Sequence, residues 1–271
     1  MLRVLLVLSL LLPPAVLGKE ITQRVEGLDV DRVLIYGAIE VEISQGEPLL
    51  LLLRGGEEAL AKQPFFADGS TLVLGESKDR SQRDTDFSDV KFKLTLPDLK
   101  AVHLRGSADV YVRPLKLGEL EVTVEGSGDM RFFDVEAQAV SLKVKGSGDL
   151  QLARLETRSL RVNMAGTGDV QLGSVNSGSM EASLAGAGDI SVEDASSVVS
   201  LEMNIVGSGD MVLDKVDAKS VEINIVGSGT ARVGASSSME VNILGSGDIF
   251  YRGKPEISKS ILGSGELHSR E

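Results

Sequence analysis

The sequence predicts an all-β fold, a single-stranded parallel β-helix (β-solenoid) with about 20 residues per turn. Three observations predict it: one four-residue phrase recurs at a nearly constant spacing, apolar residues alternate with polar ones on both sides of it, and glycine holds two fixed places in it. A unit of this size cannot enclose a core alone, but identical units stacked on one another bury a continuous column of side chains. Because parallel crossover connections are almost always right-handed, we expect a right-handed coil.

The phrase occurs nine times between Gly106 and Glu266, as GSAD, GSGD, GSGD, GTGD, GAGD, GSGD, GSGT, GSGD and GSGE. Its first glycine advances in steps of 20, 20, 20, 20, 21, 20, 18 and 18 residues. A tight corner between strands needs positive φ, which glycine adopts without a steric penalty. The glycines predicted to form the corners are Gly126, Gly128, Gly146, Gly148, Gly166, Gly168, Gly186, Gly188, Gly207, Gly209, Gly227 and Gly229.

Apolar side chains fall in columns relative to the first glycine of each phrase. They stand six, four and two residues before it, and four, six and nine residues after it. A spacing of two is the strand period, which sends these side chains to one face and excludes a helix. Each turn should therefore hold two or three short strands. The column nine residues after the glycine is Leu115, Val135, Leu155, Val175, Ala195 and Val216.

Residues 1–18 predict a secretory signal peptide. Arg3 precedes an apolar run, and small residues lead to Gly18, which is the order of a signal peptide's charged, apolar and cleavage regions. The run is too short for a membrane span. We therefore expect a secreted protein that resides in the periplasm, at the outer surface or outside the cell. The chain has no Cys, which excludes disulfides and thiolate metal sites.

Residues 19–100 predict irregular first turns that cap the solenoid, and residues 101–271 predict its regular part. Alternation within 33–43, 49–53, 71–74 and 90–96 indicates strands, 56–66 has weak helical character, and the charged stretch 76–89 indicates a solvated loop. A cover is needed because an open parallel edge recruits other chains. At the other end Lys259 takes an inward place in the last unit, where a charge suits an end turn.

The serial GSGD phrases follow a degenerate opening, GAIEVEISQGE from Gly37 to Glu47, in a chain with an export signal. In this combination the sequence resembles the bacterial head-GIN-domain family, whose members are described as putative auto-transporter adhesins. The resemblance extends over roughly residues 25–268. It implies a β-helical fold in an exported bacterial protein, and it supplies no catalytic residues to carry over.

Aspartate ends most of the phrases. Stacked turns would place these carboxylates about 4.8 Å apart, where like charges repel by about 1 kcal/mol in water. In one interpretation, turn amides donate hydrogen bonds to each carboxylate. In the other, the carboxylates form a calcium ladder, because Ca²⁺ prefers clustered oxygens. The ladder would consist of Asp129, Asp149, Asp169, Asp189 and Asp210, and no other cofactor is predicted.

The residue directly before each phrase changes character along the stack. It is charged at Arg105, Glu125 and Lys145 and apolar in the last four units. In one interpretation the corner turns this column into the core. In the other it is an apolar outer stripe that contacts a second subunit or another partner. The residues of the stripe are Val206, Val226, Leu244 and Leu262.

Composition narrows the class of function. A net charge of −12 opposes binding to nucleic acid or to anionic membrane surfaces. With two His and no Cys, spacing assembles neither a catalytic triad nor a metal site, so we predict that the protein is not an enzyme. The expected function is an exported structural, adhesive or interaction module of the bacterial cell envelope, with a second copy, an envelope protein or a glycan as partner. The alternative is a polysaccharide-active solenoid enzyme, which a groove of clustered acidic and basic side chains would favour.

Overall fold

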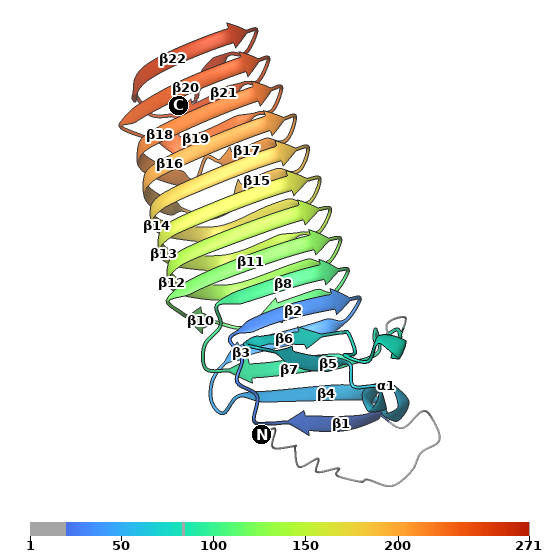
Figure 1. Ribbon diagram of the computed structural model, residues 1–271. Helices are drawn as coiled ribbons and strands as arrows, with labels where there is room; N and C mark the ends of the chain where they lie inside the picture. The colour runs from blue at the N-terminus through green and yellow to red at the C-terminus, as the bar shows by residue number, and fades with distance from the viewer. Residues whose placement is uncertain (1–19, 83–84, 271) are drawn as a thin grey trace.

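The computed structural model describes residues 20–82 and 85–270, so the predicted signal peptide lies outside the described residues. The chain forms a β-solenoid of stacked parallel turns, which confirms the predicted fold class. In Figure 1 the strands of the near face run toward the right, while the chain climbs from β8 to β22 and returns behind them, so the coil is right-handed. No helix in the described part of the chain has the length and hydropathy that a membrane span requires.

The N-terminal part contains β1 (Glu20–Val25), β2 (Arg32–Gly37), β3 (Glu40–Gln45), β4 (Leu50–Gly56), α1 (Glu57–Ala61), β5 (Phe65–Asp68), β6 (Thr71–Leu74), a 3₁₀ turn (Arg80–Gln82) and β7 (Lys91–Leu96). The regular part contains β8 (Ala101–Gly106), β9 (Asp109–Val112), β10 (Leu115–Lys116), β11 (Glu119–Gly126), β12 (Asp129–Gly146), β13 (Leu150–Gly166), β14 (Asp169–Gly186), β15 (Asp189–Val192) and β16 (Ser196–Gly207). It continues with β17 (Asp210–Leu213), β18 (Val216–Gly227), β19 (Ala231–Ala235), β20 (Ser238–Gly245), β21 (Ile249–Arg252), β22 (Glu256–Gly263) and β23 (Leu267–Arg270).

Each turn is a triangle of three strand segments. Pairing of β12 with β13 is interrupted at Phe133 and at Gln138, which are corners, and the phrase makes the third corner. We call the segment that ends at the phrase the front sheet (residues 139–146 in β12), because it forms the near face in Figure 1. The segment directly after the phrase is the rear sheet (129–132), and the remaining one is the side sheet (134–137).

The predicted apolar columns fill the interior of the triangle. Val140, Leu142 and Val144 of the front sheet are buried, as are Leu150 and Leu152 of the rear sheet in the next turn. The turns stack in register, since each first glycine lies opposite the first glycine of the turn above it, from Gly106 to Gly263. Like side chains therefore pack on like, which is how a unit without its own core becomes stable.

The irregular steps of 21 and 18 residues are both absorbed beside the side sheet. The register passes from an offset of 20 at Leu172↔Val192 to 21 at Asn176↔Ser197, so the additional residue lies between Val192 and Ser197. Ala195 is exposed there, and the prediction that it continues the inward column is wrong; Ser196 is in register with Val216 of that column instead. The shorter step removes two residues between Val233 and Ser238, while the front sheet keeps its pairing.

The N-terminal end of the stack is closed by a reversal of strand direction. β6 and β7 lie parallel to β2 and β3, but β5 is antiparallel to β6, β4 is antiparallel to β7, and β1 is antiparallel to β4. The helix predicted within residues 56–66 is α1, which packs on β4 and buries Leu60. The stretch 76–89 is not entirely solvated, because Phe87 is buried against the core.

The C-terminal end of the stack has no comparable cover among the described residues. Of the described strands, β22 pairs only with β20, and β23 only with β21. Lys259 lies in register with the buried Val241 of the turn below, yet it is exposed, because no described turn lies above it.

Candidate functional site

The two glycines of each phrase are required for different reasons. The first glycine of all nine phrases has φ between +124° and +143°, a region that residues with a side chain rarely adopt. At Gly207 an added Cβ would also lie 2.4 Å from the carbonyl oxygen of Gly186. The second glycine does not have positive φ, but at Gly209 a Cβ would lie 2.2 Å from the oxygen of Gly188 and 2.8 Å from Leu184 Cδ2. The corner therefore needs one glycine for its backbone conformation and one for close approach.

The aspartates of the phrases form a chain of hydrogen bonds along the solenoid axis. Oδ1 of Asp149 accepts the backbone N–H of Asp169 at 2.9 Å, and the same bond recurs between successive turns. The donor and acceptor pairs are Asp149 and Asp129, Asp169 and Asp149, Asp189 and Asp169, Asp210 and Asp189, and Thr230 and Asp210. The amide donor thus belongs to the next turn and not to the aspartate's own corner. Within residues 20–82 and 85–270, no group of three or more His, Asp or Glu side chains is arranged to hold a metal ion.

The outer face of the front sheet carries four columns in its C-terminal half. Val206, Val226, Leu244 and Leu262 of the apolar stripe are exposed, at 54%, 48%, 52% and 72%. Two residues further back in each strand is a column of amides, in which Asn224 Nδ2 donates to Asn204 Oδ1 and Asn242 Nδ2 donates to Asn224 Oδ1, both at 3.0 Å. The stripe and the amide ladder therefore lie side by side on one flat surface.

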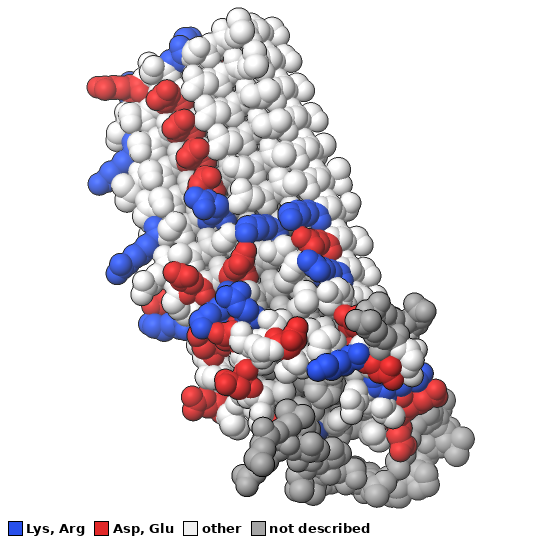
Figure 2. All heavy atoms as spheres, in the orientation of Figure 1, with Lys and Arg blue, Asp and Glu red and all other residues white. Residues whose placement is uncertain are grey.

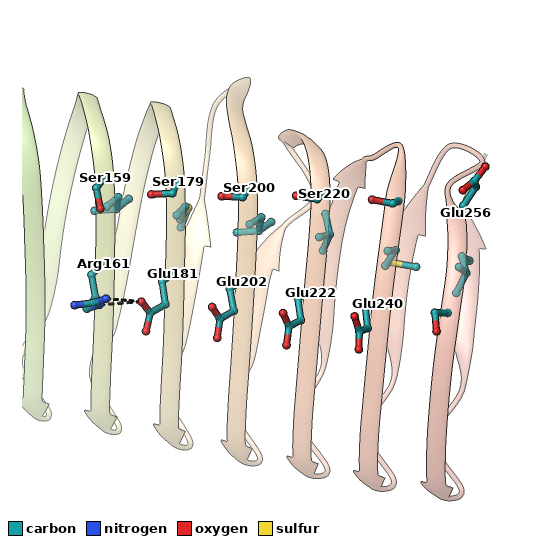
Figure 3. A pocket seen from close by; sticks show the side chains of 18 residues that line it. Ser159, Arg161, Ser179, Glu181, Ser200, Glu202, Ser220, Glu222, Glu240 and Glu256 are labelled. Atoms are coloured by element: carbon teal, nitrogen blue, oxygen red, sulfur yellow. Dashed lines mark hydrogen bonds and ion pairs between the residues drawn. The ribbon is translucent and has the colours of Figure 1, made fainter.

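The other two columns line a groove of about 710 Å³ that runs along the axis (Figure 3). Its floor follows the small side chains of Ser159, Ser179, Ser200, Ser220 and Ser238, and its wall carries the carboxylates of Glu181, Glu202, Glu222 and Glu240. Figure 2 shows a line of acidic side chains on the near face that ends at a basic side chain. In Figure 3 the labelled row of glutamates ends at Arg161, whose Nη2 lies 2.8 Å from Glu181 Oε2.

Ion pairs occupy the N-terminal half of the same face. Lys143 Nζ lies 2.6 Å from Glu121 Oε1 and Lys145 Nζ lies 3.2 Å from Glu125 Oε1. The hydrogen bond from each lysine is the main reason that the pKa of each of these carboxyl groups is below its usual value. This half of the face is therefore polar and internally neutralised, in contrast to the stripe.

The two histidines lie at opposite ends of the regular part. Nε2 of His103, in β8, lies 3.2 Å from Glu125 Oε2. His268, in β23, stacks on the ring of Phe250.

Sequence reasoning identified the apolar stripe but missed the serine and glutamate columns of the groove. The signal was present, since serine recurs seven residues, and glutamate five residues, before the first glycine in most of the last units. Serine and glutamate are common on any surface, so the pattern becomes informative only once the turns are known to stack.

A family model described as "Putative auto-transporter adhesin, head GIN domain" matches residues 29–198 and 142–255 of the chain. Among solved structures, a "putative lipid binding protein" from Parabacteroides distasonis is similar, with a TM-score of 0.68 and 24% identity over 94% of this chain and 98% of its own. A "putative adhesin" from Parabacteroides merdae has a TM-score of 0.68 and 20% identity over 94% of this chain and 97% of its own. A second "putative adhesin" from Parabacteroides distasonis has a TM-score of 0.64 and 18% identity over 93% of this chain and 98% of its own. No curated protein sequence matches the chain.

Proposed function

The chain belongs to the family described as putative auto-transporter adhesin, head GIN domain, and from this premise we propose that it is an exported, non-catalytic module of the cell envelope that associates with a second copy of itself through the front sheet. The observation that carries the proposal is the exposed apolar stripe of Val206, Val226, Leu244 and Leu262. Contiguous exposed apolar surface of this kind tends to mark an interface.

The axial repeat of the surface supports a second copy as the partner. The stripe and the amide ladder repeat once per turn, at about 4.8 Å. A partner can match every position of such a column only if it has the same repeat, and a second solenoid has it. Glu202 lies four residues before Val206 on the same face. When the apolar stripes of two copies meet, the glutamate column therefore lies toward the rim of the interface.

The area of the whole outer face of the front sheet, with its serine and glutamate columns included, is close to that of a stable interface. The six turns from Ala165 to Leu262 carry small polar or apolar residues in the last two columns. Six turns at about 4.8 Å and eight residues at about 3.3 Å give a face of roughly 750 Å². A stable association buries about 800 Å² on each partner, so the front sheet alone comes close to the required area.

The groove supports binding over catalysis. A general acid and a general base need environments that push their pKa values apart. Glu202, Glu222 and Glu240 instead occupy equivalent positions in successive turns, so stacking gives them similar surroundings. The polysaccharide-active alternative would need a break in this symmetry, and Arg161 at the end of the line is the basic group that would supply it.

Light scattering of the secreted protein tests the association. We expect the unmodified chain to have twice the monomer mass, and the triple variant Val206→Thr, Val226→Thr, Leu244→Thr to be a monomer with an unchanged circular dichroism spectrum, because Thr keeps strand propensity. Val199→Thr is the matched control, since Val199 is exposed at 51% outside the stripe. An unmodified chain that stays monomeric at high concentration contradicts self-association, and a stripe-dependent pulldown of an envelope protein or glycan would then identify another occupant.

Cell fractionation tests the location separately. The full chain should be recovered from the periplasm, the outer surface or the medium, whereas a chain without residues 1–18 should stay in the cytoplasm. Cytoplasmic recovery of both forms would contradict export while leaving the association intact.

A further inference from the structure

A cluster of arginine and aromatic side chains lies on the outer side of the rear sheet, centred on Phe250. The ring of His268 stacks on Phe250 with 4.7 Å between centroids and 20° between planes. Cζ of Arg270 lies 4.6 Å, and Cζ of Arg232 lies 5.8 Å, from the Phe250 ring centroid. The ring thus holds two guanidinium groups beside it by cation–π attraction.

Strand register explains why these residues meet. Arg232, Phe250 and His268 are partners in β19, β21 and β23, and Arg252 is the partner of Arg270. Successive strands are about 4.8 Å apart. Because Ile249 points into the core and side chains alternate along a strand, Phe250 and its partners point outward. Three arginines are thereby gathered on adjacent turns of one face.

Two of these arginines have no carboxylate partner in the described part of the chain. Among the described residues neither Arg232 nor Arg270 forms a salt bridge, and the buried Nε of Arg232 has no hydrogen-bond partner. Arg252 is anchored, since its Nη2 donates to the carbonyl oxygen of Asp214 at 2.7 Å and to Asp217 Oδ1 at 3.3 Å. In a chain with a net charge of −12, two guanidinium groups that lie on a common ring and pair with no carboxylate of residues 20–82 and 85–270 are available to an external anion.

We infer that Arg232 and Arg270, held beside the ring of Phe250, form a binding site for a phosphate group. A guanidinium donates in a fixed planar fork that matches phosphate oxygens. A phosphate monoester offers three acceptor oxygens and nearly two negative charges, so it can bridge guanidiniums from different turns. A carboxylate offers two oxygens, which a single guanidinium occupies. Stacking on Phe250 restricts the arginines before the ligand arrives, which lowers the entropy cost of binding.

The neighbouring carboxylates do not fill the site. Oδ1 of Asp248 accepts the backbone N–H of Glu266 at 3.0 Å, and Oε2 of Glu266 lies 3.8 Å from His268 Nε2. The net negative charge of the whole chain opposes an extended anionic surface. A single phosphate group therefore fits the cluster better than a continuous array of them.

The test follows the arginine side-chain N–H signals by NMR while inorganic phosphate is added to the full chain, with acetate at equal ionic strength as the reference anion. Phosphate should shift the signals of Arg232 and Arg270 saturably, and acetate should not. In Arg270→Gln the affinity should fall at least tenfold. Arg154→Gln is the matched control, because Arg154 is also an exposed arginine, but lies on the side sheet and is paired with Glu156 at 2.6 Å.

No saturable phosphate shift, or equal affinity in Arg270→Gln and Arg154→Gln, overturns the inference. If Arg232→Gln fails to fold, Arg270→Gln still decides, because Arg270 is exposed. Sedimentation with vesicles that contain phosphatidic acid, whose headgroup is a phosphate monoester, compared with phosphatidylcholine vesicles, then identifies the source. Vesicle binding that is lost in Arg270→Gln assigns the phosphate to a lipid headgroup, and phosphate binding without vesicle binding assigns it to a free phosphate or phosphorylated sugar.

Discussion

The backbone N–H of Asp169 donates to Oδ1 of Asp149 in the preceding turn of the solenoid, at 2.9 Å. Asp149→Ala removes this acceptor and leaves the amide in a partly buried position without a partner. Loss of such a bond to a charged group costs about 1 to 3 kcal/mol, so we expect the melting temperature to fall by about 2 to 4 °C for each kcal/mol lost. Asp149→Asn is the control, since it keeps Oδ1 and should melt close to the unmodified chain. Equal melting temperatures of Asp149→Ala and Asp149→Asn would show that this hydrogen bond does not stabilise the fold.

The effect of calcium on stability tests independently whether the same aspartates bind a cation. Because each Oδ1 is already engaged by an amide of the next turn, we expect EDTA and millimolar Ca²⁺ to leave the melting temperature unchanged. A cation that binds only the native state raises stability by mass action. A clear rise with Ca²⁺ in scanning calorimetry would therefore favour the calcium ladder over the hydrogen-bonded chain.

Gly207→Val should destabilise the fold by several kcal/mol. A β-branched residue at a φ of +127° is strained, and its Cβ would lie 2.4 Å from the Gly186 oxygen. Gly118→Ala is the control, because a Cβ there meets nothing within 4 Å and the residue does not have positive φ. Chemical denaturation of both variants measures the difference, and a Gly207→Val midpoint equal to that of Gly118→Ala would contradict the corner argument.

The ion pair of Glu42 and Arg113 should make stability dependent on pH. Nε of Arg113 donates to Oε1 of Glu42 at 2.9 Å, and this bond lowers the pKa of Glu42. A carboxyl group with a lowered folded pKa stabilises the fold above its unfolded pKa of about 4.3, and this stabilisation is lost as pH falls through the folded value. Glu42→Gln should thus melt lower than the unmodified chain at pH 7 and equally at pH 2. A difference that persists at pH 2 would mean that packing, and not charge, is responsible.

Lys259→Ile should increase association at the C-terminal end of the stack. Lys259 occupies an inward column in the last described turn, and an inward charge on an edge strand discourages pairing with other chains. Replacement by Ile completes an apolar edge, so larger species should appear in analytical ultracentrifugation. Lys254→Ile removes the same charge from the loop before β22 and should have no such effect.

Repetition made most of the fold predictable. In the regular part each repeat of the phrase indicates the same strand register, since Gly126, Gly146 and Gly166 lie opposite one another in successive turns. The antiparallel strands β1, β4 and β5 occur once each: only β4 was expected, from the apolar run 49–53, whereas β1 and β5 were not predicted, and nothing in the sequence indicated that β4 runs antiparallel. Ala195 was placed inward because a local insertion shifts register without changing composition.

The candidate site was predictable only in part, for a related reason. Alternation assigns Val206 and Ile205 to opposite sides of a strand, but a corner beside the glycine could have turned Val206 inward. The exposed side chains of Val206 and Val226 show that the front sheet continues to Gly207 before the corner begins. The cluster around Phe250 joins residues 18 to 20 positions apart, where no local pattern relates them.

The three edges of the prism differ in how they tolerate a change of chain length. At the phrase the backbones of successive turns are so close that a single methyl group would collide with a carbonyl oxygen. The side sheet and the corners that flank it instead accept an additional residue near Ala195 and the loss of two residues before Ser238. The side sheet and its two corners therefore absorb changes in chain length, while the front and rear sheets keep their alignment. A peptide inserted between Glu193 and Ala195 should project from the corner between the rear and side sheets. Amide hydrogen exchange of the front sheet should stay unaltered, so this corner is a site where further sequence can be attached without disturbing the stack.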